Sequence, residues 1–168
     1  MIEAKRLLVI ADDLIGRSRK GQPNQTALRR AVSTAYYALF HHLVRSAADA
    51  LVGARNSKKP RYALIYRAFD HGRMRQVSEL LDKRHLGEKA KAALGITTPP
   101  PDLRDIATIF ASLQQRRHWA DYDPTGKMTR ADVKDLVEQA ELAINKTESL
   151  PENLKKDFLV FLMTSSRA

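Results

Sequence analysis

Side chains that are able to do chemistry gather in the segment from residue 113 to residue 124. It holds the only tryptophan of the chain, two adjacent arginines, a histidine and a tyrosine: Trp119, Arg116, Arg117, His118 and Tyr122. Arginine binds phosphate through a planar fork of N–H donors, and histidine exchanges protons near neutral pH. In a groove, the arginines would hold phosphate, and Tyr122 or His118 would contact a base or act in proton transfer.

The same segment also has a structural interpretation. Arg117 follows the apolar Leu113 by four residues, and Asp121 follows Arg117 by four. On a helix this spacing allows an ion pair between Arg117 and Asp121. The segment then predicts a clamp at the end of a helical bundle, with Trp119 as a core or interface anchor. Both interpretations stay open at the level of the sequence.

The elements that position this segment are predicted to be helices, because apolar residues recur at helical spacing and no β-type alternation stands out. Helices are expected over residues 2–17, 24–51, 61–70, 73–81, 102–123 and 130–147, with a short helix inside 150–163. Gly72 is expected to mark a kink, and residues 83–101 are expected to be loop-like. The fold class is all-α, with an antiparallel four-helix bundle core and additional short helices.

Three of these helices carry more detailed expectations. The first has an apolar stripe that we expect to be buried, formed by Leu7, Ile10, Ala11, Leu14 and Ile15. The helix over 24–51 is apolar or small nearly all round, which is typical of a central helix with neighbours on several sides. Thr129 with Asp132 resembles a capping box before the helix at 130–147, and Ser149 with Glu152 resembles a second.

The C-terminal helix contains the run from Phe158 to Met163, which is too apolar to remain in water. It is expected either to pack on the domain or to form a dimer contact.

The 168 residues are most simply one domain over 1–168, with its core at about 25–147. No run approaches the ~18–20 apolar residues of a membrane span. The N-terminus does not resemble a signal peptide, and the lack of cysteine fits a cytoplasmic protein.

Charge is distributed unevenly along the chain. The net charge is +10, yet residues 1–100 hold 19 Lys/Arg against 8 Asp/Glu, and residues 101–168 hold 10 against 11. All of the positive excess therefore lies in the first hundred residues, which makes RNA, a nucleotide or another polyanion a plausible partner. The alternative is an ordinary solvated basic surface. We expect binding through Arg116 and Arg117 together with basic residues of the first half, which are Arg29, Arg30, Lys58, Lys59 and Arg61.

Two motifs resemble one protein family. The segment 29–41, Arg-Arg-Ala-Val-Ser-Thr-Ala-Tyr-Tyr-Ala-Leu-Phe-His, resembles the second-helix signature of HEPN domains (higher eukaryotes and prokaryotes nucleotide-binding) and contains Tyr36 and Tyr37. The segment 117–123 resembles the R-x-x-A-D-Y end of a later helix in one branch of that superfamily. The resemblance implies an all-α bundle, frequently dimeric with a cleft shared by two protomers. It also implies either metal-independent ribonuclease activity or pairing with a small nucleotidyltransferase.

The chain departs from the family's ribonuclease motif, which is an arginine followed, after four to six other residues, by a histidine. None of the five histidines has an arginine at that distance, and Tyr122 stands where Arg117 would require the histidine. Tyrosine ordinarily titrates near pH ~10, so it is a weaker acid–base group at neutrality. Arg117, His118 and Tyr122 remain the candidate catalytic residues. The sequence holds no Gly-rich phosphate loop, H-E-x-x-H or G-x-S-x-G motif, and we expect neither metal nor cofactor.

Three functions are therefore expected as alternatives. The first is a dimeric module that binds RNA or nucleotide, with degenerate or absent ribonuclease activity. The second is an active ribonuclease of a toxin or defence system. The third is a protein-interaction subunit paired with a nucleotidyltransferase, using the apolar C-terminal helix.

Overall fold

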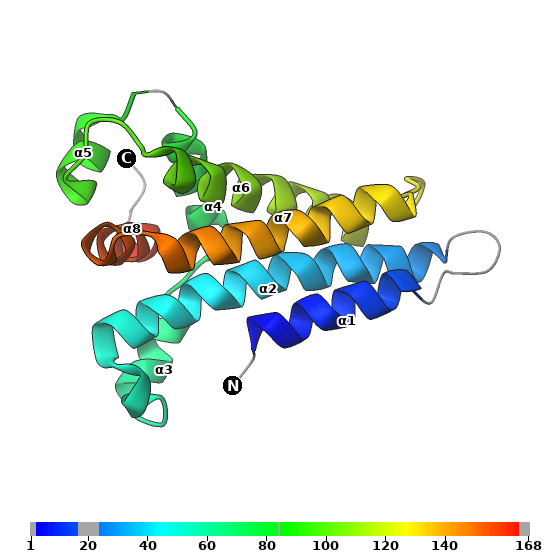
Figure 1. The fold of residues 1–168 in the computed structure, drawn as a ribbon, viewed down its shortest axis with the longest axis horizontal. Helices are drawn as coiled ribbons and strands as arrows, with labels where there is room; N and C mark the ends of the chain where they lie inside the picture. Colours follow the sequence, from blue (N-terminus) through cyan, green and yellow to red (C-terminus); the bar gives the residue numbers. More distant parts are fainter. Residues whose placement is uncertain (1–2, 17–23, 84, 165–168) are drawn as a thin grey trace. The chain divides into compact units, whose positions relative to one another are not determined.

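The computed structural model describes residues 3–16, 24–83 and 85–164, and the regular structure of these residues is entirely helical (Figure 1). The α-helices are α1 Ala4–Gly16, α2 Gln25–Val52, α3 Pro60–Arg67, α4 His71–Leu81, α5 Glu88–Leu94, α6 Pro101–Tyr122, α7 Arg130–Ser149 and α8 Glu152–Thr164, with a 3-10 turn, η1, at Ala54–Asn56. The all-α fold class is thereby confirmed. The four-helix bundle core stays a prediction.

The contacts within the chain define two compact units. Unit 1 comprises residues 1–41 and 109–145, and unit 2 comprises residues 42–108 and 146–168. Helices α2, α6 and α7 contribute residues to both units. The prediction of a single domain over 1–168, with its core at 25–147, stays a prediction.

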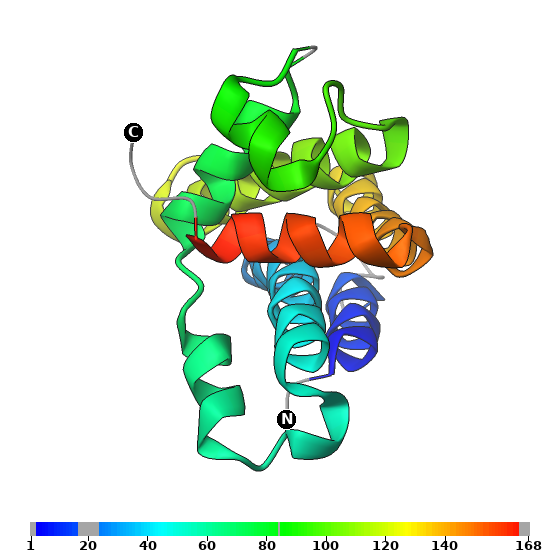
Figure 2. The ribbon, with the colours of Figure 1, turned by 90° about the vertical axis from the view of Figure 1, so that its left-hand side faces the viewer.

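Unit 1 is built around the first half of α2. Tyr36 is fully buried there, and its ring lies 5.6 Å from the ring of Phe110 on α6. Helix α1 lies beside α2 (Figure 2). The expected stripe of α1 was only partly right: Ala11 is buried and Leu7, Leu14 and Ile15 are partly buried, but Ile10 is 48% exposed and the buried Leu8 was not expected. The helix has enough apolar residues for two stripes, so periodicity alone did not identify the buried one.

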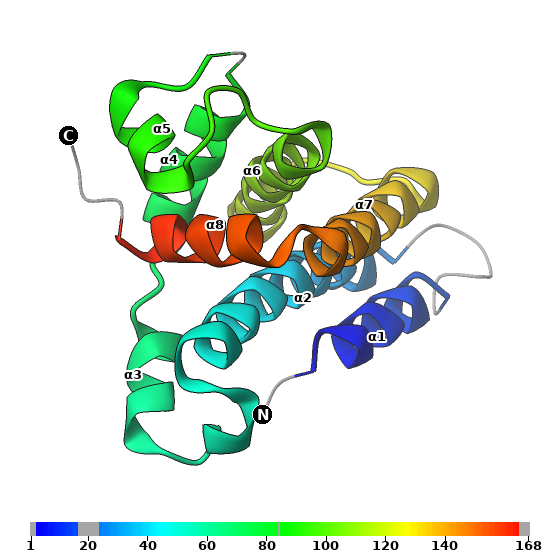
Figure 3. The same cartoon turned by 60° about the vertical axis from the view of Figure 1, so that its left-hand side comes forward.

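The core of unit 2 includes the apolar face of helix α8. This helix packs against α4 and α5 (Figure 3), and Phe158, Leu159, Phe161 and Leu162 are all buried within the single chain. The apolar C-terminal run is therefore a core element of unit 2. The alternative expectation, that Phe158 and Phe161 form a dimer contact, is wrong because neither side chain is accessible to a partner.

Two local predictions in unit 2 also need correction. The segment 83–101 contains helix α5, which is only seven residues long and buries just Ala90 and Leu94. That pattern is too short to stand out in the sequence. The chain interruption expected at Gly72 lies instead between α3 and α4, where Asp70 caps α4 by accepting a hydrogen bond from the Arg73 N–H, 2.9 Å.

The start of α7 is the predicted capping box. The Asp132 N–H donates to Thr129 Oγ1 at 3.1 Å, and the Thr129 N–H donates to Asp132 Oδ2 at 3.2 Å. Helix α7 then runs through Ser149, and the Lys155 N–H donates to the Pro151 carbonyl to open α8. The second box, Ser149 with Glu152, stays a prediction. Among the described residues, none of the helices has both the length and the apolar character that a bilayer span requires.

Candidate functional site

The connection between α6 and α7 is fixed by one arginine of α2. The Arg29 guanidinium donates hydrogen bonds to the carbonyl oxygens of Ala120 at 2.8 Å, of Asp123, and of Gly126 at 2.6 Å. Carbonyls at a helix C-terminus lack partners within the helix, so Arg29 caps α6. Three N–H donors of Arg29 are thus used inside the protein, and the expectation that Arg29 binds nucleic acid stays a prediction.

Trp119 is held between this arginine and the connection. The Arg29 guanidinium carbon lies 5.6 Å from the centre of the indole. A Cβ placed on Gly126 would lie only 1.8 Å from Cζ2 of Trp119, so the backbone of the connection approaches the ring as closely as glycine alone permits. Trp119 is thus an anchor of unit 1, as the structural interpretation expected.

Asp123 and Gln25 complete the connection. The Asp123 carboxylate accepts from the N–H and hydroxyl of Thr125, at 2.8 and 2.9 Å, and from the Gly126 N–H at 3.0 Å. These bonds, led by that of the Thr125 N–H, lower the pKa of Asp123. The Gln25 amide donates to the Met128 carbonyl at 3.0 Å and accepts from its N–H at 2.9 Å.

Arg117 forms the predicted clamp with Asp121. Its Nε lies 2.8 Å from Asp121 Oδ2, and the two side chains are 22% and 29% exposed. The Nε–H does not point squarely at the carboxylate, so the contact is an ion pair rather than a linear hydrogen bond. Asp121 Oδ1 also accepts from the Ser33 hydroxyl at 2.6 Å, which joins the clamp to α2.

The two tyrosines of α2 complete the environment of Arg117. Its Nη2 donates to the Tyr37 hydroxyl at 3.1 Å, and the guanidinium carbon lies 5.4 Å and 6.0 Å from the centres of the Tyr37 and Tyr36 rings. Tyr36 is buried, whereas Tyr37 is only partly buried and stacks with His41 at 6.0 Å. Arg117 is therefore oriented by charge, by a hydrogen bond and by aromatic faces.

His118 and Tyr122 lie next to this cluster and reach solvent. Their ring centres are 4.7 Å apart, and Tyr122 is 66% exposed. We use the name "α2–α6 strip" for the polar residues that line this part of unit 1, which are Ser33, Tyr37, His41, Arg117, His118, Asp121 and Tyr122. Arg30 is exposed one turn before Thr34 on α2. Ser33 and His41 lie within the segment 29–41 but were not predicted as site residues, because their role depends on which face of α2 meets α6.

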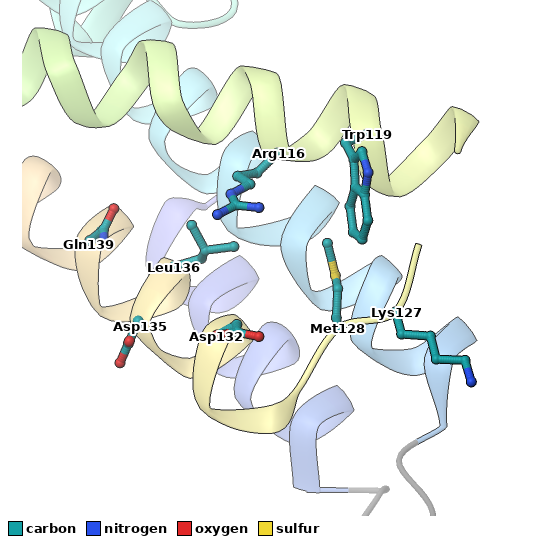
Figure 4. Close-up of a pocket in the computed structure, with 8 residues that line it drawn as sticks. All are labelled: Arg116, Trp119, Lys127, Met128, Asp132, Asp135, Leu136 and Gln139. Atoms are coloured by element: carbon teal, nitrogen blue, oxygen red, sulfur yellow. The ribbon is translucent and has the colours of Figure 1, made fainter. Parts of the chain in front are cut away.

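Arg116 belongs to a different place. It lines a pocket of about 240 Å³ together with Trp119 of α6, Lys127 and Met128 of the connection, and residues of α7 (Figure 4). The α7 residues are Asp132, Asp135, Leu136 and Gln139. The predicted cluster of Arg116, Arg117 and Tyr122 is therefore divided, because adjacent residues of a helix point in different directions.

The pocket contains cations and anions side by side. Asp132 is held by its capping bonds with Thr129, which lower its pKa, and nearby Arg116 lowers the pKa further. Neither Arg116 nor Lys127 lies within ion-pair distance of a carboxylate among the residues that the structure describes. Within the same ranges, no group of three His, Asp or Glu side chains is arranged to hold a metal ion.

The other predicted binding residues lie in unit 2. Lys58, Lys59 and Arg61 are exposed around η1 and the start of α3. With Arg55 and Arg67 they form what we call the basic platform, within residues 53–69, which contain no acidic residue. Gly53, at φ +89°, turns the chain out of α2, and the Tyr62 hydroxyl donates to Asp49 at 2.8 Å, which ties α3 to α2.

Comparisons with known proteins give no relative for this chain. No protein-family model matches it, and neither a curated protein nor a solved structure does. The candidate site is accordingly defined by its own residues and their geometry.

Proposed function

We propose that the chain is a HEPN-like module that binds RNA or a nucleotide through the α2–α6 strip, with the basic platform as an additional phosphate-binding surface. The observation that carries the proposal is the environment of Arg117. A half-buried guanidinium is oriented by Asp121 and Tyr37, directly beside the exposed pair of His118 and Tyr122. A side chain that is already ordered loses little entropy when it binds a ligand.

The chemistry of the strip favours contacts to bases as well as to phosphate. Asp121 offsets the charge of Arg117, and the exposed Arg30 precedes Ser33 by three residues, a spacing that puts both on one face of α2. His118 and Tyr122 offer exposed ring faces, and unpaired RNA bases stack on such rings. The strip thus combines a phosphate ligand with a stacking surface, and the net charge of +10 supplies long-range attraction.

Ribonuclease activity is the second candidate, and one observation favours it. The rings of His118 and Tyr122 lie 4.7 Å apart next to Arg117, so an acid–base group and a phosphate ligand are close together. The third candidate, partner binding through the C-terminal helix, loses its surface because the apolar face of α8 is buried in unit 2. A nucleotidyltransferase-type partner would have to bind elsewhere.

Binding is tested by fluorescence polarisation with a labelled pool of single-stranded RNA. Arg30→Ala and Tyr122→Ala should each weaken RNA binding. For Tyr122→Ala, which removes a stacking ring, we expect a loss of affinity of roughly 5- to 50-fold. Arg75→Ala is the matched control, because it also removes one exposed arginine charge. Equal weakening by Arg30→Ala and Arg75→Ala, with no effect of Tyr122→Ala, would show that only overall charge matters and would reject the strip.

Catalysis is tested by incubating the same RNA pool with pure protein and with the Arg117→Ala variant. An active ribonuclease should lose most of its activity in the variant. Identical RNA decay in both samples would remove the ribonuclease candidate.

The homodimer that the resemblance implies is tested by light scattering of the purified chain, and a monomer mass across the concentration range would reject it.

A further inference from the structure

The pocket between α6, the connection and α7 is separate from the α2–α6 strip and has no role in the function proposed above. Its walls come from Trp119, Met128 and Leu136, and Arg116 points into it from α6 (Figure 4). Its volume of about 240 Å³ is smaller than the ~300–1,000 Å³ of a site for a drug-sized ligand. The pocket therefore fits one ring system with a small attached group.

The lining specifies the chemistry of such a ligand. The indole of Trp119 and the thioether of Met128 favour an aromatic body. The amide of Gln139 offers both a donor and an acceptor, and the Asp135 carboxylate accepts. Together they suit a ring whose edge carries amino and carbonyl groups.

The two cations of the pocket favour an anionic substituent on that ring. Arg116 and Lys127 have no carboxylate within ion-pair distance among the described residues, whereas Asp132 is held by its capping bonds. A phosphate linked through a ribose to a polar heterocycle satisfies both halves of the lining. We propose that this pocket binds one nucleobase, with its attached phosphate, from single-stranded RNA. The inference rests on the proposed function, because that function supplies the RNA strand.

Trp119 makes the pocket directly observable, because it is the only tryptophan in the chain. Titration with each of the four nucleoside 5′-monophosphates should quench its fluorescence to saturation for at least one base. Ribose 5-phosphate, which lacks the base, should have no effect. N-acetyltryptophanamide corrects for light absorbed by the nucleotide. Absence of saturable quenching by every nucleotide and by a single-stranded oligonucleotide would overturn the proposal.

Two variants locate the binding. Arg116→Ala and Gln139→Ala remove polar contacts from exposed or half-exposed positions, so the fold should persist, as circular dichroism will verify. Loss of the hydrogen bond from Arg116 to the charged phosphate should weaken the binding measured by quenching about tenfold or more, and loss of the bond from Gln139 to the neutral base edge should weaken it about two- to tenfold. Glu138→Ala, which is exposed on α7 and does not line the pocket, is the matched control and should leave the titration unchanged. An equal effect of all three variants would overturn the assignment.

The two proposals fail in different ways. If RNA binding depends on Arg30 and Tyr122 but the oligonucleotide leaves Trp119 fluorescence unchanged, the pocket proposal is wrong and the proposed function stands. If mononucleotides quench Trp119 but the chain binds no RNA, the pocket takes a free nucleotide, and both the RNA source and the strip proposal are rejected.

Discussion

At the scale of single residues, Gly126 determines how the connection between α6 and α7 is packed. Its backbone occupies the space where any other residue would place a Cβ against the indole of Trp119. Arg29 binds the Gly126 carbonyl from the α2 side, so the glycine is held from two directions. The tryptophan therefore depends on a residue that the sequence does not mark as special.

We expect Gly126→Ala to destabilise the protein by about 1–3 kcal/mol, as overpacking of a well-packed site usually does. The reason is the 1.8 Å approach of the new Cβ to Cζ2 of Trp119. Urea denaturation followed by Trp119 fluorescence measures the effect. Gly87→Ala is the control, because its Cβ meets nothing within 4 Å. Equal midpoints for the two variants would show that the close approach is not present in solution.

The carboxylates at the two ends of the connection make stability depend on pH. Hydrogen bonds lower the pKa of Asp123 and of Asp132 in the folded state. Each group therefore stabilises the fold above the unfolded pKa of about 3.9, and this stabilisation is lost as the pH falls through the lower folded value. Asp123→Asn should be less stable than the wild type at pH 7, and the difference should shrink below about pH 4.

Urea midpoints at pH 7, 4 and 3 measure this difference. Asp157→Asn is the control, because Asp157 is exposed on α8 and has no hydrogen bond among the described residues. Its midpoints should follow the wild type at every pH. A difference for Asp123→Asn that stays constant from pH 7 to pH 3 would contradict the assigned role of its charge.

At the scale of elements, the contact between α2 and α3 depends on one hydroxyl. Burial and the hydrogen bond to Asp49 raise the pKa of Tyr62 to about 12. Because the folded pKa lies above the unfolded one, this contact stabilises the fold fully below about pH 10 and is lost as the pH rises through 12.

We expect the tyrosinate absorbance of wild type minus Tyr62→Phe to give a difference curve with its midpoint near pH 12. The other tyrosines cancel in the subtraction, and Tyr122→Phe supplies the comparison for an exposed ring. A Tyr62 midpoint near pH 10 would mean that the hydroxyl is open to solvent, and that the basic platform is not tied to α2.

Substitutions in helix α8 are expected to change the stability of the fold and not the association of the chain with a partner. Phe158 is fully buried under α4 and α5, so Phe158→Ala should cost about 3–5 kcal/mol, the usual range for removing a buried phenylalanine. Lys156→Ala, exposed on the same helix, should stay within about 0.5 kcal/mol of the wild type. Urea denaturation measures both variants. A fully stable Phe158→Ala protein would contradict the packing of unit 2.

At the scale of the whole molecule, the positive excess of the first hundred residues is displayed at more than one place. The basic platform presents five cations, and none of them has a carboxylate partner among the described residues. The exposed Arg30 on α2 is a further cation from the first hundred residues, outside the platform. Neutralising phosphates releases counterions, so RNA affinity should fall steeply with salt.

Replacing Lys58, Lys59 and Arg61 together by alanine should reduce the slope of log K against log[salt] by about 2, at roughly 0.7 per phosphate contact on a single strand. A triple variant of Arg73, Arg75 and Lys83 changes net charge equally and is the control. Polarisation titrations at several salt concentrations give both slopes. If the two slopes fall equally, the platform is only a solvated basic surface.

The sequence was sufficient for features that depend on neighbours along the chain. The helical pattern, the capping box of Thr129 and Asp132, and the ion pair of Arg117 and Asp121 all join residues three or four positions apart. Such contacts are set by helix geometry, whatever the helix packs against. The same reasoning missed α5, whose seven residues provide too few apolar positions to reveal a period.

Only the tertiary structure decided what each of these residues faces. It assigned Arg29 to the carbonyls that end α6, separated Arg116 from Arg117, and buried Phe158 instead of exposing it to a partner. These outcomes depend on which face of a helix meets residues about 90 positions away in the chain, as Arg29 meets Ala120 and Gly126. A helical period fixes the directions of side chains around their own axis, but the direction that becomes buried is fixed by packing.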